Sequence, residues 1–109
     1  MKNKKIVNLT SHPINVLDEK FQVVKIIPPS GMVLRLPVKE EITGTICGVP
    51  VKKKEYRLEE LPKKKKDTLF VVSLPVAQLS KRDDFIVPND IIRDKDGKIL
   101  GCQSFTKIV

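Results

Sequence analysis

The sequence predicts a mostly-β domain of the α+β class, a small antiparallel barrel-like or two-layer sheet with one short helix over residues 74–80. Val and Ile recur along the whole chain, which favours strands over helix bundles. Eight Pro and five Gly interrupt the chain at short intervals, as in short strands joined by turns. A length of 109 residues suffices for one core but not for two, so we expect a single domain over residues 1–109.

Short apolar segments bounded by turn residues mark the expected strands. In the first half of the chain these are residues 5–10, 14–17, 21–27 and 32–38, followed by a hairpin of residues 40–47 and 49–56 that turns at Gly48. In the second half they are residues 69–72, residues 85–87 ending at a Pro88-Asn89-Asp90 turn, and a hairpin of residues 91–93 and 98–105 through Asp96-Gly97. Closing such a sheet into a barrel would also remove its exposed edges.

The segment Thr68–Leu79 carries the strongest candidate for a ligand site. Its apolar run Leu69–Val72 predicts a buried strand that ends at Ser73, and Pro75 suits the first turn of a helix. Backbone N–H groups at a helix start have no partner within the helix and attract anions. The alternative role for Ser73 is to cap the helix.

A dense polar cluster, Arg82, Asp83 and Asp84, follows this junction. In the functional interpretation Arg82 binds an anionic ligand while an Asp accepts a hydrogen bond from a ribose hydroxyl or a base edge. In the structural interpretation one Asp pairs with Arg82 or caps a turn. Both interpretations stay open at this point.

Two turns add weaker candidates. Ser30 and Gly31 lie in a stiff loop after two prolines. The backbone of this loop could approach a ligand closely, and the alternative role of the loop is a tight corner between strands. His12 lies in a turn that carries the same ambiguity. The candidate ligand-binding residues are therefore Ser73, Arg82, Asp83, Asp84, Ser30, Gly31 and His12.

The net charge of +8 predicts an anionic partner. Much of the excess lies in two lysine runs, which are typical of solvated loops but offer weak nucleic-acid binding as an alternative function. Nucleic-acid readers interleave such lysines with Arg and aromatic side chains, and this chain has no Trp. The residues of this alternative are Lys52, Lys53, Lys54, Lys63, Lys64, Lys65 and Lys66.

Catalytic and metal-binding patterns are absent from the sequence. One His and two distant Cys have no metal-ligand spacing, so we expect neither a metal nor a cofactor. Ser73 lacks the glycines of a nucleophile elbow, which favours a binding protein over an enzyme. No apolar run reaches the ~20 residues that cross a bilayer. We expect no membrane contact, a cytoplasmic location, and Cys47 and Cys102 in the reduced form.

The chain resembles a family of small proteins found in phages, prophages and bacterial genomes. The resemblance lies in blocks along nearly the whole length: residues 6–17, 27–31, 70–73 with 76–78, 82–84 with 87–88, and 93–94 with 97–102. The family brings no established biochemical function. This chain departs from it by its Lys-rich loops, where relatives tend to be more acidic.

The resemblance implies the bacterial host's cytoplasm as the setting and suggests a specific function by analogy. Small phage proteins without catalytic groups often sequester a nucleotide signal of host immunity or block a host protein. We therefore expect a non-enzymatic accessory protein that forms a homo-oligomer and binds a small anionic ligand such as a nucleotide. The alternatives are a protein-interaction accessory that blocks a host protein, and the weak nucleic-acid binder described above.

Overall fold

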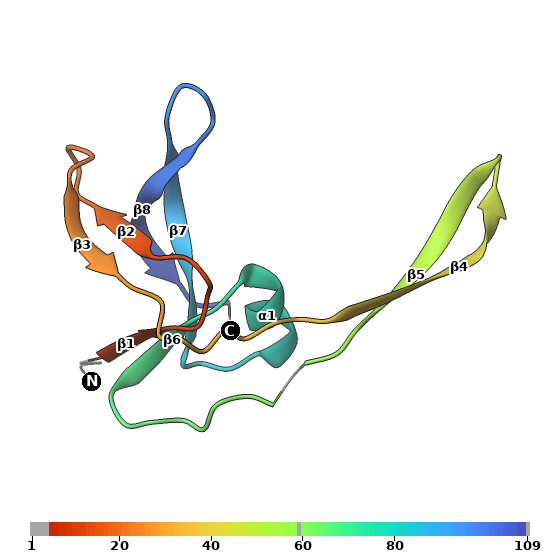
Figure 1. The fold of residues 1–109 in the computed structure, drawn as a ribbon, viewed down its shortest axis with the longest axis horizontal. Helices are drawn as coiled ribbons and strands as arrows, with labels where there is room; N and C mark the ends of the chain where they lie inside the picture. Colours follow the sequence, from red (N-terminus) through yellow and green to blue (C-terminus); the bar gives the residue numbers. More distant parts are fainter. Residues whose placement is uncertain (1–4, 59, 109) are drawn as a thin grey trace.

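The computed structural model describes residues 5–58 and 60–108, which form a curled six-stranded sheet, one helix and a projecting hairpin (Figure 1). The six strands lie in the order β1-β6-β7-β8-β2-β3, while β4 and β5 form a sheet of their own. The predicted mostly-β fold with one short helix is confirmed. The elements are β1 (Lys5–Asn8), β2 (Ile14–Leu17), β3 (Val23–Ile27), β4 (Val38–Ile46), β5 (Val49–Tyr56), β6 (Thr68–Val71), α1 (Leu74–Ser80), β7 (Phe85–Arg93) and β8 (Ile99–Thr106).

The six-stranded sheet is mixed, so the prediction of an antiparallel sheet is wrong for several pairs. Strands β1 and β6, β6 and β7, and β2 and β8 run parallel, while β2 with β3 and β7 with β8 run antiparallel. The connection through α1 explains the β6–β7 pair. This crossover returns the chain to the end of the sheet where β6 began. Two neighbouring parallel strands require such a crossover.

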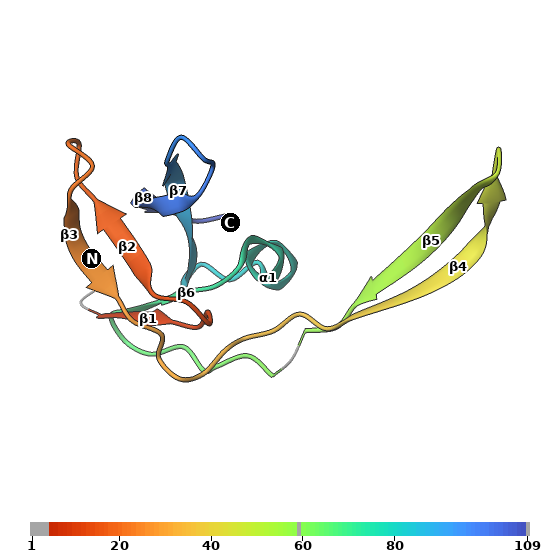
Figure 2. The same cartoon turned by 45° about the horizontal axis from the view of Figure 1, so that its top comes forward.

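The sheet curls until its two outer strands meet at one end. Asn8 at the end of β1 forms an isolated bridge with Pro29, just beyond β3. The backbone N–H of Ser30 donates to the Asn8 carbonyl over 2.9 Å. The result is a partly closed barrel, in which β1 and β3 touch at this end and separate at the other (Figures 1 and 2).

The main core lies between α1 and the β1-β6-β7 part of the sheet. Phe70 and Phe85 face each other from neighbouring strands, with ring centroids 6.0 Å apart and an interplanar angle of 79°. Such edge-to-face pairs add roughly 0.5–1.5 kcal/mol beyond their buried area. The buried residues of this cluster are Leu9, Leu34, Phe70, Val72, Val76, Ala77, Phe85 and Val87.

Helix α1 begins and ends where the residue chemistry requires. Pro75 occupies its first turn, where the missing N–H removes no hydrogen bond. Lys81 ends it in the left-handed conformation at φ 52°, and its N–H donates to the Ala77 carbonyl over 3.1 Å. Val76 and Ala77 form its buried face.

Two other expectations are corrected. Residues 32–37 form an extended connection, not a strand, because the Leu34 N–H donates to the Leu9 carbonyl but no regular ladder follows. Residues 85–93 form one strand instead of two, running through Pro88. A proline fits there because β6 has already ended, so at Pro88 the strand is paired only with β8.

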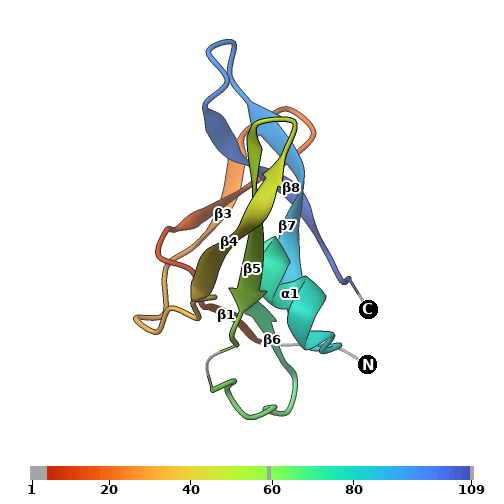
Figure 3. The same cartoon turned by 90° about the vertical axis from the view of Figure 1, so that its right-hand side faces the viewer.

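The β4–β5 hairpin, called the arm below (residues 38–56), stands away from the barrel in Figures 1 and 2 and points toward the viewer, in front of the barrel, in Figure 3. Neither of its strands comes near another strand or helix among the described residues. The radius of gyration is 17.0 Å, whereas a compact chain of this length has about 13 Å. The arm is therefore an extension of the domain and no part of its core.

Candidate functional site

The arm is the feature of this structure least explained by the stability of the fold. Every one of its residues is exposed. A two-stranded hairpin without a third strand or a packing surface is at best marginally stable in water. Its six large apolar side chains have exposed fractions from 38% for Val51 to 66% for Ile46; they are Val38, Ile42, Ile46, Val49, Val51 and Tyr56.

The strand register distributes these side chains over both faces of the arm. Directly paired residues share a face, and the pairing of Ile46 with Val49 places an apolar patch at the tip, which Val51 extends. We call these three residues the tip patch. Val38 and Tyr56 are paired at the base of the arm. The bulge between Ile42 and Gly44 shifts the alternation, so the patches at the two ends lie on opposite faces.

Ion pairs occupy the middle of the arm. The Glu40 carboxylate lies 3.3 Å from the Lys54 ammonium and 3.8 Å from that of Lys52, and Lys53 lies 3.4 Å from Glu55. These exposed pairs contribute little to stability. They do, however, partly neutralise the first of the two lysine runs that the sequence offers for nucleic-acid binding.

Both outer edges of the arm resist pairing with a further strand. Pro50 removes a backbone donor from β5, and three consecutive lysines follow it. The bulge interrupts the edge of β4, where the Thr43 hydroxyl donates to the Val51 carbonyl over 3.2 Å. Contacts of the arm with another molecule would therefore use the side chains of its faces.

Ser73 lies at the rim of an apolar groove on the barrel. Its hydroxyl makes no capping hydrogen bond, and the helix that it precedes has only seven residues. The groove runs between the start of α1 and the end of β8, and its exposed apolar side chains are Leu74, Ile91 and Ile108. The predicted anion site at this helix start thus has an apolar setting.

Arg82 forms a nearly closed set of contacts within the fold. Its guanidinium binds the Asp84 carboxylate through two hydrogen bonds, of 2.9 and 2.6 Å, and donates a third to the Pro62 carbonyl. It also lies 4.4 Å from the centroid of the Phe85 ring. The expectation that an Asp pairs with Arg82 is confirmed.

The structure does not bring Ser73 and Arg82 together. Ser73 follows the carboxyl end of β6, whereas Arg82 precedes the amino end of β7, and these strands run parallel with Phe70 opposite Phe85. The two residues therefore lie at opposite ends of the strand pair. A single pocket containing Ser73 and the Arg82–Asp84 cluster is not formed.

Asp83 belongs to a second, basic hollow. The Lys64 ammonium donates to its carboxylate over 2.8 Å, and this contact holds the pKa of Asp83 below its ordinary value. Lys65, Lys66 and Lys107 line the same hollow. Part of the second lysine run therefore surrounds one depression in the surface, while Asp67, Asp83 and Asp84, which line it as well, offset much of its charge.

Ser30 and His12 both contact Asn8, which is only 1% exposed. The Asn8 amide donates to the carbonyls of His12 and Ile27 over 2.8 and 3.2 Å, and the Ser30 N–H donates to the Asn8 carbonyl. The role of these turns in the structure is to hold the ends of β1 and β3 together. Gly31, at φ 97°, makes the sharp corner that follows.

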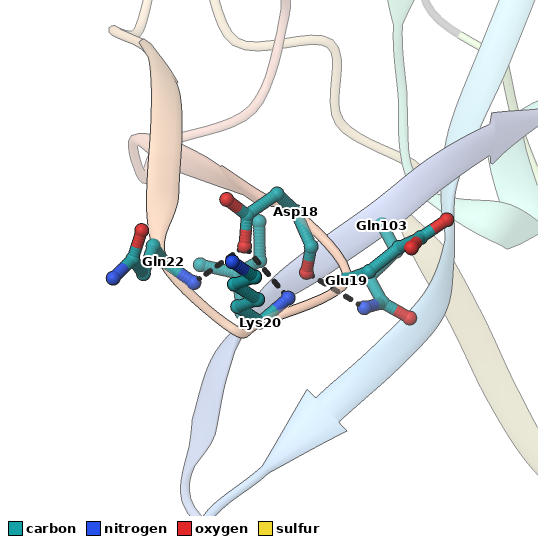
Figure 4. Close-up of a pocket in the computed structure, with 6 residues that line it drawn as sticks. Asp18, Glu19, Lys20, Gln22 and Gln103 are labelled. Carbon is teal, nitrogen blue, oxygen red and sulfur yellow. Dashed lines mark hydrogen bonds between the residues drawn. The ribbon is translucent and has the colours of Figure 1, made fainter.

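A further polar hollow lies at the β2–β3 turn, which the sequence did not single out (Figure 4). The Asp18 carboxylate accepts from the N–H groups of Lys20 and Gln22, each over 2.9 Å, and the Gln103 side-chain amide donates to the Asp18 carbonyl. These polar groups already satisfy one another. The arrangement is that of a turn tied to β8.

Within residues 5–58 and 60–108 no three His, Cys, Asp or Glu side chains gather as a metal site requires. No helix in the described part of the chain is long and apolar enough to span a membrane. Cys47 is exposed at the tip of the arm, while Cys102 is buried, and this burial raises the pKa of its thiol. Comparisons of the chain with protein-family models, curated proteins and solved structures find no match.

Proposed function

We propose that this chain is a non-enzymatic accessory protein that acts through protein–protein contacts of its arm. The observation that carries the proposal is a fully exposed hairpin with six large apolar side chains, whose strands contact no other strand or helix among the described residues. Exposed apolar patches, such as those at the tip and the base of the arm, mark interaction surfaces. Folding alone supplies no reason to extend them into solvent.

The chemistry of the arm favours a folded protein partner over a nucleic acid or a small ligand. Its apolar groups lie on both faces, its central charges pair with one another, and its edges are protected against strand addition. Val, Ile and Tyr side chains gain most from burial in an apolar pocket of a partner. In the bacterial setting that the sequence resemblance suggests, such a partner would include a host protein that the arm blocks.

Site-specific photo-crosslinking in cells tests this proposal. A photoreactive residue in place of Ile46 should form crosslinks to protein, either to a second copy or to another chain. The matched control is the same residue at Lys95, which is exposed in the β7–β8 turn at a distance from the arm. Protein crosslinks from position 46 and none from position 95 would support the proposal. The absence of protein crosslinks from position 46 would overturn the proposal.

A second candidate function, binding of a small anionic ligand such as a nucleotide, is supported by the basic hollow. Lys64, Lys65, Lys66 and Lys107 line one depression together with Asp67, Asp83 and Asp84, so its ammonium groups exceed its carboxylates by one and a phosphate there would meet a small excess of positive charge. Sequestration of a nucleotide signal would follow if the ligand is bound tightly. Arg82 is not needed for such binding because Asp84 already holds its guanidinium.

Thermal-shift measurements against a nucleotide panel test this second candidate. The doubly substituted Lys65→Ala/Lys66→Ala protein should lose any stabilisation that a nucleotide gives. The control Lys52→Ala/Lys53→Ala removes the same charge from the arm and should keep it. An equal loss of stabilisation in both variants would indicate an effect of overall charge. In a separate measurement, binding of single-stranded nucleic acid that weakens steeply as salt rises would favour the nucleic-acid alternative.

A further inference from the structure

We propose that the partner of the arm is a second copy of this chain, and that the tip patch of each copy docks in the apolar groove of the other. This inference rests on the proposed function, because it names the occupant of the same surface. The tip patch is Ile46, Val49 and Val51. The groove is the one beside the start of α1, with Leu74, Ile91 and Ile108 on its surface.

The two surfaces match in chemistry. The groove offers apolar side chains from α1 and β7 and from Ile108 beyond β8, with Val87 and Pro88 also in its lining. The tip patch offers β-branched side chains with exposed fractions of 66% for Ile46, 62% for Val49 and 38% for Val51. Among the described residues no ionisable side chain lines the groove, so an apolar patch can enter it without desolvating a charge of these residues.

The position of the two surfaces fits a closed pair. The arm and α1 extend from the same side of the barrel, and the C-terminal end of the chain lies there as well (Figures 1 and 2). Two copies that face each other across a two-fold axis can therefore make the contact twice. An acceptor on the far side of the barrel, such as the exposed strand β3, would instead give an open chain of molecules.

The area of the contact also requires the reciprocal arrangement. The tip patch spans about three residues along each strand, which at about 3.3 Å per residue and about 10 Å across two strands is a flat area of roughly 100 Å². A stable interface buries roughly 800 Å² on each partner. A single tip contact falls well short of this value. Two contacts, in which each copy supplies a tip patch and a groove, double the buried area, and the relief of the side chains adds to the flat value.

Charge gives the association a specific salt dependence. Each copy carries a net charge of +8, so two copies repel each other at low ionic strength. Screening by salt weakens this repulsion and leaves the apolar contact intact. Dimerisation should therefore strengthen as salt rises, whereas binding of a polyanion would weaken.

Sedimentation of the purified protein tests the inference. We expect a mass of twice the 12.3 kDa of one chain. Ile46→Lys/Val49→Lys should weaken the dimer by roughly 100-fold or more, because it places charges at buried anchors. The control Thr45→Lys adds a charge one residue away on the opposite face of the arm and should leave the dimer unchanged. A monomeric wild-type protein at high concentration, or equal effects of both variants, would overturn the inference.

Crosslinking from Cys47 gives a measurement that does not depend on a variant folding. A benzophenone attached to this exposed thiol at the arm tip should react with the partner's groove. Mixed light and heavy isotope-labelled protein shows whether the bond joins two copies. Intermolecular products in peptides containing Leu74, Ile91 or Ile108 support the inference, and products at residues 21–26 or none between copies overturn it. If the protein is monomeric but position 46 captures another protein in cells, only this inference fails; if position 46 captures nothing, the proposed function fails too.

Discussion

Arg82 and Asp84 form a two-point ion pair at the amino end of β7, with side chains only 16% and 12% exposed. The guanidinium also contacts the Phe85 ring and the Pro62 carbonyl, so it connects the segment before β6 to the core. This geometry explains the dense polar cluster of the sequence as a brace of the fold. A ligand that used Arg82 would first have to displace Asp84.

Replacing Arg82 should therefore destabilise the fold. Removing one partner of a buried ion pair costs 3–5 kcal/mol, and the residual exposure here reduces the expected loss for Arg82→Ala to about 2–3 kcal/mol. Arg82→Lys should lose about half as much, since an ammonium cannot make the paired contact. Thermal unfolding, with the exposed Arg35→Ala as control, measures both. An unchanged melting temperature for Arg82→Ala would show that the side chain does not brace the fold.

Asn8 is the second polar brace, and its amide should be essential. Its Oδ1 accepts hydrogen bonds from the N–H and hydroxyl of Thr10 over 2.9 and 2.6 Å, while its Nδ2 donates to two carbonyls. Asn8→Asp would bury a charge against those carbonyls and should cost about 3 kcal/mol or more. Asn15→Asp, whose amide makes one long, exposed hydrogen bond, is the matched control. Equal denaturation midpoints for the two variants would contradict this role.

Gly101 should tolerate no side chain. A Cβ there would lie 2.5 Å from the Asn15 carbonyl oxygen, which would force β2 and β8 apart. Gly101→Ala should cost about 1–3 kcal/mol, as overpacking usually does. Gly44→Ala in the arm meets nothing within 4 Å and should have little effect. Chemical denaturation of the two variants checks this, and a stable Gly101→Ala protein would show that the β2–β8 contact is looser than described.

The two cysteines should differ strongly in reactivity. Cys47 is exposed, whereas burial raises the pKa of Cys102 above its ordinary value of 9.0. A thiol reagent at mild alkaline pH should modify Cys47 rapidly and Cys102 only on unfolding. The folded protein holds the Cys102 proton more tightly than the unfolded chain does. The contribution of this thiol to the free energy of unfolding is therefore complete below the thiol's unfolded pKa and is lost as the pH rises through its folded pKa. Cys102→Ala should remove this dependence, and equal modification rates would contradict the burial.

Local residue chemistry predicted the individual elements well. Pro75 with Val76 and Ala77 located α1, and Gly48 located the turn of the arm, where Cys47 and Gly48 both have positive φ as a two-residue hairpin turn requires. The parallel pairing of β6 with β7 was missed because it depends on the path of the chain through α1. The same crossover separates Ser73 from Arg82, although only eight residues lie between them in the sequence.

The projection of the arm could not be predicted from its residues. Val38, Ile42 and Ile46 alternate with polar side chains as in a strand that covers a core, and this pattern does not specify whether the apolar groups meet their own chain or another. The bulge after Ile42 further hides which face each side chain occupies. The available signal is apolar residues on both faces around a block of lysines, and such a lysine block is equally typical of a solvated loop.

The most direct test of the role of the arm is amide hydrogen exchange across residues 38–56, measured on dilute and on concentrated protein. An unpartnered hairpin opens readily and exchanges fast, whereas one docked on a second copy is protected. If the arm docks on a second copy, its protection should rise with protein concentration, while the exchange rates in β6 and β7 stay constant. Fast exchange of the arm at every concentration, in pure protein and in cell extract alike, would contradict it.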